Sequence, residues 1–155
     1  MQSETKPSSS ITKILVPVDG SEHALRAVRV AAEMALKYQA KLLLLSVVPA
    51  PGFALLGPVG APADLTDYYR LGNEEANRAI DGAKKVAQEA GVEAGGKVVQ
   101  PVNSAAEAIC EYAASENVSV IVMGTRGLGG FKKLVLGSVS GGVVSNSHCS
   151  VLVVR

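Results

Sequence analysis

The sequence predicts an α/β fold, in which a five-stranded parallel sheet carries helices on both faces. Runs rich in apolar and β-branched residues alternate along the chain with segments of helical periodicity. Such an order joins parallel strands through right-handed helical crossovers. The length of 155 residues fits one domain, and the sequence contains no internal repeat. We therefore expect a floppy tail over 1–10 and a single domain over 11–155.

The first three elements follow from local patterns. The run "ITKILVPVD" (11–19) is predicted to be a buried strand. Ser21 is a suitable cap for a helix over 22–38, where apolar pairs recur at three- and four-residue spacing. The next strand, "KLLLLSVVP" (41–49), is apolar on both faces, which is typical of parallel sheets covered by helices.

The middle of the chain begins with an irregular segment. Residues 50–64 are apolar but rich in Pro and Gly, which excludes long regular structure. A helical pattern starts at Leu65, becomes clearer from Ala76 and is expected to stop at Gly91.

A weaker strand, 96–102, follows. Its Pro101 places it at an edge of the sheet or marks its own end. The sequence "SAAE" (104–107) is a capping box that opens a helix reaching about residue 116. The remaining elements are a strand over 118–124, a short helix from near Ser138 and a last strand over 150–154.

Composition narrows the possible partners. The chain is 48% hydrophobic and 19% charged with a net charge of +1, which argues against disorder and names no nucleic-acid partner. No apolar run approaches the roughly 20 residues of a membrane helix, and "MQSETKPSSS" lacks the apolar core of a signal peptide. We therefore expect a cytoplasmic protein without a membrane partner. Cys110 and Cys149 are expected to be small buried thiols, and His23 a neutral surface histidine.

The stretch "GTRGLGGFKKLVLGS" (124–138) carries the functional signal. Its glycines follow a strand and expose backbone amides, and Gly137-Ser138 opens a helix whose free N–H groups favour an anion. Arg126 and Ser138 offer further donors. Residues 117–155 contain four basic residues and no acidic one. We therefore predict phosphate binding here, although the Walker A and G-x-G-x-x-G signatures are both missing.

A second loop, "PVDGS" (17–21), is expected at the same edge of the sheet, since ligands of doubly wound sheets bind beyond the strand ends. With it, the spacing Gly124-x2-Gly127-x9-Gly137-Ser138 resembles the nucleotide-binding motif of the universal stress protein family. The resemblance runs from Ile11 to Arg155 and includes "ILVPVDGS", "IVMGTRG" and "VLVV". It implies a Rossmann-like fold of the adenine nucleotide alpha hydrolase-like type, with strand order 3-2-1-4-5, ATP as ligand and a homodimer.

The resemblance also implies roles for particular residues. Asp19 lies beside the nucleoside, and the last strand, Ser150 to Val154, pairs across the dimer. The adenine pocket is lined by Pro17, Val18 and Val47. The ribose and the α-phosphate lie near Met123 and Gly124. The phosphates are held by Arg126, Gly127, Gly137, Ser138 and Val139. Two features depart from the family pattern, namely Cys149-Ser150 where Cys-Pro is common, and the segment 50–64.

The functional prediction is an ATP-binding regulatory protein of the stress response with slow or no hydrolysis. The glycine stretch contains no carboxylate, histidine or glutamine to orient a water, so no catalytic residue is assigned. Mg²⁺ is expected to be held mostly by phosphates and water. The alternatives are an ATPase or phosphotransferase that uses Asp19 or a group from 50–75, a sensor of AMP or a cyclic nucleotide, and a dimerisation module with an empty pocket.

Overall fold

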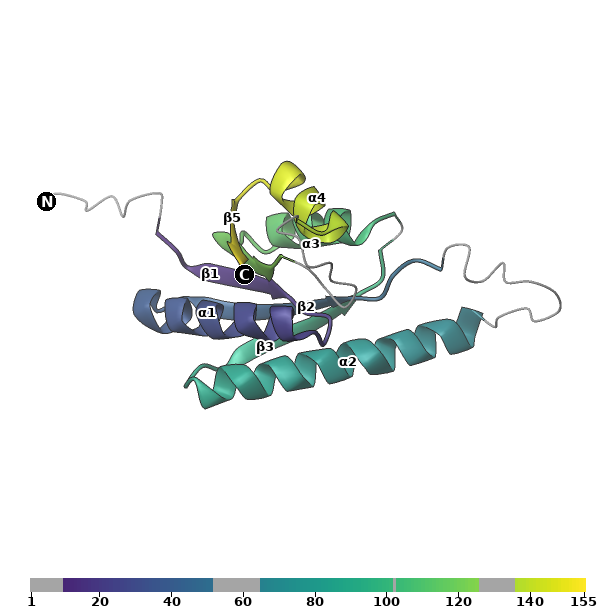
Figure 1. Cartoon of the computed structure of the whole chain (residues 1–155), viewed down its shortest axis with the longest axis horizontal. Helices are drawn as coiled ribbons and strands as arrows, with labels where there is room; N and C mark the ends of the chain where they lie inside the picture. The colour runs from purple at the N-terminus through teal and green to yellow at the C-terminus, as the bar shows by residue number, and fades with distance from the viewer. Residues whose placement is uncertain (1–9, 52–64, 102, 126–135) are drawn as a thin grey trace, which may run out of the picture.

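A computed structural model describes residues 10–51, 65–101, 103–125 and 136–155. Strands and helices alternate along the described chain, as Figure 1 shows, in the order β1 (Lys13–Pro17), α1 (Glu22–Tyr38), β2 (Lys41–Val47), α2 (Leu65–Glu89), β3 (Ala94–Val99), α3 (Ala105–Ser115), β4 (Val120–Gly124), α4 (Ser138–Asn146) and β5 (Ser150–Val154). The strands form one parallel sheet in the order β3-β2-β1-β4-β5. The predicted fold class and strand order are confirmed.

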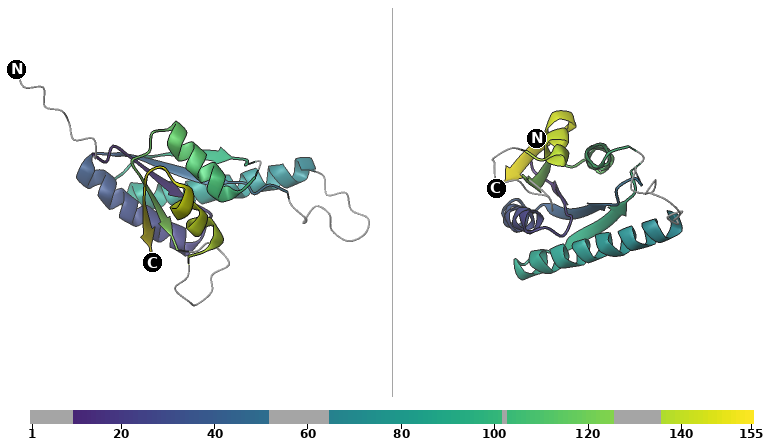
Figure 2. Two further views of the ribbon diagram at one scale, coloured as in Figure 1. Left: turned by 90° about the horizontal axis from the view of Figure 1, so that it is seen from above. Right: turned by 45° about the vertical axis from the view of Figure 1, so that its right-hand side comes forward.

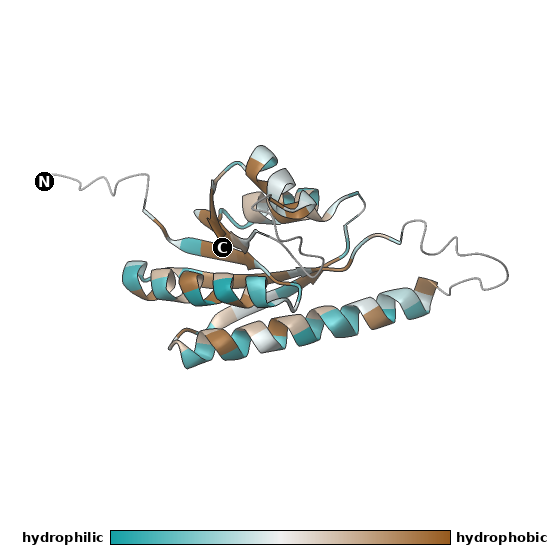
Figure 3. Ribbon diagram, viewed as in Figure 1, coloured by the Kyte–Doolittle hydropathy of each residue, from teal (hydrophilic) through white to brown (hydrophobic). Residues whose placement is uncertain are grey.

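Helices cover both faces of the sheet. Figure 2 shows α1 and α2 on one face and α3 and α4 on the other. Side chains of a strand alternate between the faces, so Ile14 and Val16 pack under α1 and α2 while Leu15 packs under α3 and α4. This explains the continuous apolar runs in the central strands. The apolar stripes of α1 and α2 alternate with polar surface along each helix in Figure 3.

The predicted helix caps are present. Ser21 Oγ accepts a hydrogen bond from Ala24 N at 3.2 Å, and α1 has the predicted bounds. Ser104 Oγ accepts from Glu107 N at 3.1 Å at the start of α3. Both serines therefore satisfy an amide that the first helical turn leaves without a partner.

Four predicted strands have different bounds in the structure. β4 covers 120–124 rather than 118–124. β1 covers 13–17 rather than 11–19, because the chain turns at Gly20, whose φ is +85°. β2 ends at Val47 rather than at 49. β3 covers 94–99 rather than 96–102, since its pairing with β2 begins at Ala94 and stops before Pro101. β3 is nevertheless an edge strand, as Pro101 indicated. The tail over 1–9 and residues 52–64 lie outside the described residues.

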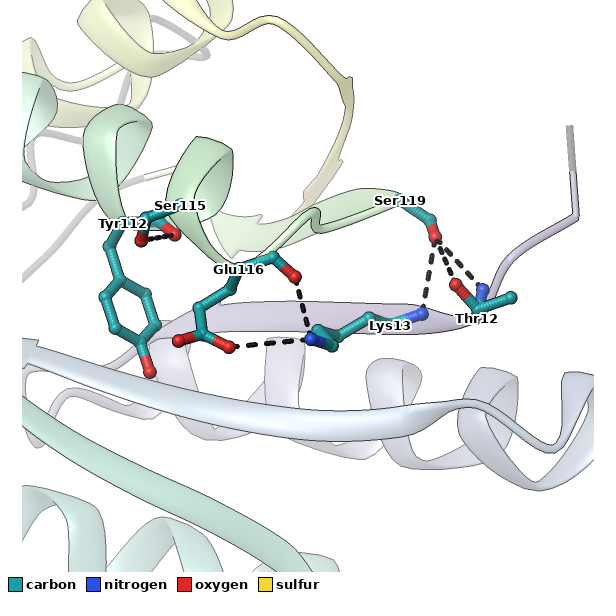
Figure 4. A network of polar contacts seen from close by, with 6 residues as sticks. All are labelled: Thr12, Lys13, Tyr112, Ser115, Glu116 and Ser119. Atoms are coloured by element: carbon teal, nitrogen blue, oxygen red, sulfur yellow. Dashed lines mark hydrogen bonds and ion pairs between the residues drawn. The ribbon is translucent and has the colours of Figure 1, made fainter. Parts of the chain in front are cut away.

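A polar network fixes the sheet at the edge where its strands begin (Figure 4). Lys13 Nζ donates to the carbonyl of Glu116 at 2.7 Å and lies 3.5 Å from its carboxylate. Ser119 Oγ accepts from the backbone N–H groups of Thr12 and Lys13 at 3.0 and 3.3 Å. These contacts hold the start of β1 against the turn between α3 and β4. They align the two strands whose opposite ends carry the candidate site.

Candidate functional site

The candidate site lies at the carboxyl edge of the sheet, by which we mean the edge where the strands end. β1 and β4 are neighbours there, with Ile14 opposite Val120 and Leu15 opposite Ile121. After β1 the chain crosses to β2 on one side, whereas β4 lies on the other. Strand order therefore reverses between β1 and β4, and this is the position at which doubly wound sheets bind their ligands.

A tight turn closes the end of β1. Val18 is buried and its N–H donates to the carbonyl of Leu45 at 2.8 Å. Asp19 follows it, exposed, and its Oδ1 accepts from Ser21 N at 2.9 Å. Gly20 between them has a φ of +85°, a conformation that glycine adopts readily. One carboxylate oxygen of Asp19 thus stabilises the turn while the side chain remains open to solvent.

The end of β4 lies directly against the first turn of α1. A Cβ added to Gly124 would lie 2.9 Å from the Cβ of His23 and 3.0 Å from its backbone carbon and oxygen. Only glycine lets the two backbones approach this closely. Gly124 therefore has a packing role at this position that its sequence motif did not reveal.

Hydrogen bonds at Thr125 bring the two ends of the glycine stretch together. The carbonyl of Thr125 accepts from Gly137 N at 2.8 Å and from Ser140 Oγ at 2.8 Å, and its N–H donates to the carbonyl of Val154 at 3.1 Å. The first turn of α4 consequently begins beside the end of β4. The intervening residues 126–135, which include Arg126 and Gly127, lie outside the described residues.

The start of α4 has the features of an anion site. Gly137 is its N-cap residue, and no side chain of the described residues supplies a capping hydrogen bond there. Ser138 and Val139 are exposed, and the first turn contains no acidic residue. The amides of a first helical turn have no partner within the helix, and together with the helix dipole they favour a negative group at such a terminus.

The remaining predicted site residues lie at the same edge but not on one face. Pro17 and Val47 are half-buried at the ends of β1 and β2. Met123 is 5% exposed and packs, with Val47, in the core beneath α3 and α4, whereas Val18 packs beneath α1 and α2. Val18 and Met123 therefore form part of the floor of the site.

Three residues at this edge were not predicted to belong to the site. Thr125 acts through its backbone, so its side chain gave no signal. Ser140 is buried and joins the start of α4 to β4, and only its place two residues after Ser138 hinted at a role. His23 is half-buried, and its Nδ1 is buried with no hydrogen-bond partner within the described part of the chain.

Replacing Ser140 by Ala is expected to loosen this edge. The change removes the hydroxyl donor to the carbonyl of Thr125, although Gly137 N still reaches that oxygen. We expect a loss of about 1 kcal/mol in the free energy of unfolding, the usual value of one hydrogen bond. Chemical denaturation measures it, with Ser145→Ala on the exposed side of α4 as the matched control. An equal loss in both variants would contradict the assigned role of Ser140.

The described residues contain neither a membrane-spanning helix nor a cluster of metal-ligating side chains. No helix among them is long and apolar enough to cross a membrane. No three His, Cys, Asp or Glu side chains among them gather as metal ligands.

Comparisons with known proteins cover nearly the whole chain. The profile of the universal stress protein family matches residues 10–155. A universal stress protein of Bacillus subtilis is 36% identical over 92% of this chain and 98% of its own length. One of Methanocaldococcus jannaschii is 34% identical over 92% of this chain and 81% of its own length.

Solved structures of universal stress proteins also match nearly the whole chain. A universal stress protein from Lactobacillus plantarum has a TM-score of 0.76 and 28% identity, covering 94% of this chain and 98% of that one. A second universal stress protein, solved in complex with cAMP, has a TM-score of 0.70 and 26% identity, covering 95% and 99%.

Proposed function

The chain belongs to the universal stress protein family, and from that premise we propose that it binds ATP between the ends of β1 and β4 and regulates other proteins according to its nucleotide state. The observation that carries the proposal is the hydrogen bond from Gly137 N to the carbonyl of Thr125, 2.8 Å long. This hydrogen bond holds the first turn of α4 at the point where strand order reverses. Phosphate groups are well matched to that position.

In this proposal the phosphates lie along the glycine stretch and the start of α4. The amide and hydroxyl of Ser138 and the amide of Val139 donate to them, together with Arg126 and Gly127. Gly137, whose N–H is bonded to the carbonyl of Thr125, holds the start of the helix against them. The exposure of Ser138 and Val139 supports these roles, as does the lack of a side-chain cap from the described residues. Met123 and Gly124 support the ribose and α-phosphate from below.

The nucleoside is proposed to lie over the end of β1. Asp19 is exposed there, and its Oδ1 is already fixed by Ser21 N at 2.9 Å, so its position is set before any ligand arrives. A preset carboxylate suits the hydroxyl groups of a ribose. Pro17, Val18 and Val47 supply apolar surface for the base.

Mg²⁺ is proposed to accompany the nucleotide. Such an ion reaches its site on phosphate oxygens and keeps several waters. No side chain is assigned to the ion, since Asp19 is assigned to the nucleoside and the Ser138 hydroxyl to the phosphates.

Hydrolysis is proposed to be slow or absent. It requires a group that orients water near the γ-phosphate, and the glycine stretch contains no carboxylate, histidine or glutamine. Asp19 lies on the side assigned to the nucleoside. ATP therefore serves in this proposal as a signal that changes partners or oligomeric state.

A second copy of the chain is the proposed partner, docked through β5. β5 is an edge strand of the described sheet, pairing only with β4 there. Its sequence SVLVV is apolar, and Leu152 is 39% exposed. An exposed apolar edge strand is a ready template for pairing with another strand. The carbonyl of Val154 bonds Thr125 N at 3.1 Å, so the same strand touches the nucleotide site.

The nucleotide that copurifies with the protein tests the proposal. The chain is purified without added nucleotide and denatured, and the released molecules are identified by mass spectrometry beside a Gly127→Val variant. Bound ATP in the native protein and none in the variant is the expected result. ADP in place of ATP, with phosphate release that Asp19→Ala abolishes without loss of binding, would transfer the proposal to an ATPase.

A cyclic nucleotide is the second candidate ligand. A structure 26% identical to this chain was solved in complex with cAMP. The start of α4 would offer the phosphate of cAMP the amide and hydroxyl donors that are proposed for ATP. Titration with ATP, ADP, AMP and cAMP separates the candidates. We expect affinity to fall as the β- and γ-phosphates are removed, whereas an affinity that is highest for cAMP would favour the second candidate.

A further inference from the structure

The two cysteines of the chain lie on the same side of the sheet. Cys110 belongs to α3, and Cys149 belongs to the turn that leads from α4 into β5. Both are half-buried and unpaired, and both pack against the core cluster beneath α3 and α4, which contains Ile109 and Val151. Two thiols that are distant in sequence therefore share one packed layer and remain partly open to solvent.

The packing of α3 against α4 brings these two positions near each other. Both helices return from the carboxyl edge of the parallel sheet, so they run in the same direction, and Figure 2 shows them together on one face. They touch where a Cβ added to Gly142 would lie 2.7 Å from the Cβ of Ala106. Cys110 is one turn beyond Ala106 on the same face of α3. Cys149 follows the end of α4 and therefore lies beyond Gly142 in the same direction.

The electrostatics agree with this placement. The pKa of the Cys110 thiol is raised above its ordinary value, first by burial and second by the charge of Cys149. The charge of Cys149 therefore acts on Cys110 within the layer that both residues share. The Cys149 thiol also has a polar neighbour, since Ser147 Oγ lies 3.3 Å from its Sγ.

We propose that Cys110 and Cys149 form a redox-active dithiol site, which a low-molecular-weight disulfide such as glutathione disulfide oxidises to an intramolecular Cys110–Cys149 disulfide. The site is independent of the nucleotide proposal and lies at the opposite edge of the sheet. It assigns to the two cysteines a function beyond filling the core.

The reaction consists of two thiol–disulfide exchanges. The Cys149 thiolate attacks one sulfur of the oxidant, forms a mixed disulfide and releases the first thiolate of the oxidant. The Cys110 thiolate then attacks the Cys149 sulfur and releases the second. The protein loses two electrons and two protons, and the oxidant is reduced to two thiols. Cys149 reacts first because the raised pKa of the Cys110 thiol leaves less of that group as the reactive thiolate.

Oxidation of the full-length protein tests this proposal. The reduced chain is equilibrated in buffers of increasing glutathione disulfide to glutathione ratio, quenched with acid and analysed by intact mass. We expect a species that is lighter by two hydrogen atoms and carries no glutathione. Proteolysis without reduction is expected to yield the Cys110 and Cys149 peptides joined to each other, and the chain is expected to remain a monomer on a denaturing gel.

Single serine variants test the order of events. Cys110→Ser is expected to stop at a stable glutathione adduct on Cys149, whereas Cys149→Ser is expected to acquire its adduct several times more slowly. Circular dichroism confirms that each variant is folded, and Cys110→Ala replaces Cys110→Ser if the hydroxyl is not tolerated. Glutathione on both cysteines of the native protein without a link would overturn the proposal. So would a disulfide between chains, or no reaction under conditions that oxidise the unfolded chain.

Discussion

Replacing Ser138 by Asp is expected to separate nucleotide binding from stability, because the two change in opposite directions. Ser138 is exposed in the first turn of α4, and no acidic residue lies in that turn. A carboxylate there interacts well with the helix dipole, so we expect the free energy of unfolding to stay level or rise by about 0.3–1 kcal/mol. The same charge repels phosphates. We expect ATP affinity to fall by roughly tenfold or more, which is about 1.4 kcal/mol per factor of ten.

Two variants of the same helix control this prediction. Ser138→Asn has the size of the aspartate without its charge, and should weaken binding far less. Ser145→Asp introduces the charge in the last turn of α4, where the dipole disfavours it. It should lower stability slightly and leave ATP affinity unchanged. If Ser138→Asp bound ATP as tightly as the wild type, the phosphates would not lie at the start of α4.

Replacing Gly124 by Ala is expected to give the largest loss of stability among single methyl additions at the site. The new Cβ would lie 2.9–3.0 Å from the Cβ, backbone carbon and backbone oxygen of His23. A backbone cannot yield as a flexible side chain does, so the first turn of α1 must move away from β4. Overpacking of this kind costs about 1–3 kcal/mol. Because α1 begins immediately after the Asp19 turn, ATP affinity should fall as well.

Gly82→Ala is the matched control for Gly124→Ala. Gly82 is exposed in α2, and an added Cβ meets no atom within 4 Å. Alanine in an open helical position should raise the free energy of unfolding by about 0.5–1 kcal/mol. Urea denaturation of the two variants beside the wild type measures both effects. A Gly124→Ala protein as stable as Gly82→Ala would show that α1 and β4 are not in close contact.

Much of the fold could be predicted from local sequence. Ser21 and Ser104 are caps whose side chains bond a nearby amide, and such contacts depend only on neighbouring residues. The alternation of Ile14, Leu15 and Val16 between two cores follows from strand geometry and from apolar residues on both faces. The bounds of β3 were less predictable, because a strand ends where its pairing with a neighbour ends, and its neighbour β2 lies elsewhere in the chain.

The candidate site could be predicted in its parts but not in its assembly. Glycine spacing and Asp19 indicated two loops, whereas the bond between Gly137 N and the Thr125 carbonyl joins backbone groups and leaves no trace in residue type. The burial of His23 Nδ1 and the packing of Gly124 on α1 depend on the distance between two elements. Such distances are a property of the folded molecule, which local sequence does not encode.

Calorimetric titration of the native protein with Mg-ATP, beside Gly127→Val, is the most direct test of the central claim. We expect saturable binding at one site per chain in the native protein and its loss in the folded variant. Binding that survives unchanged in Gly127→Val, or a native protein that takes up no ATP at millimolar concentration, would contradict a nucleotide site at the ends of β1 and β4.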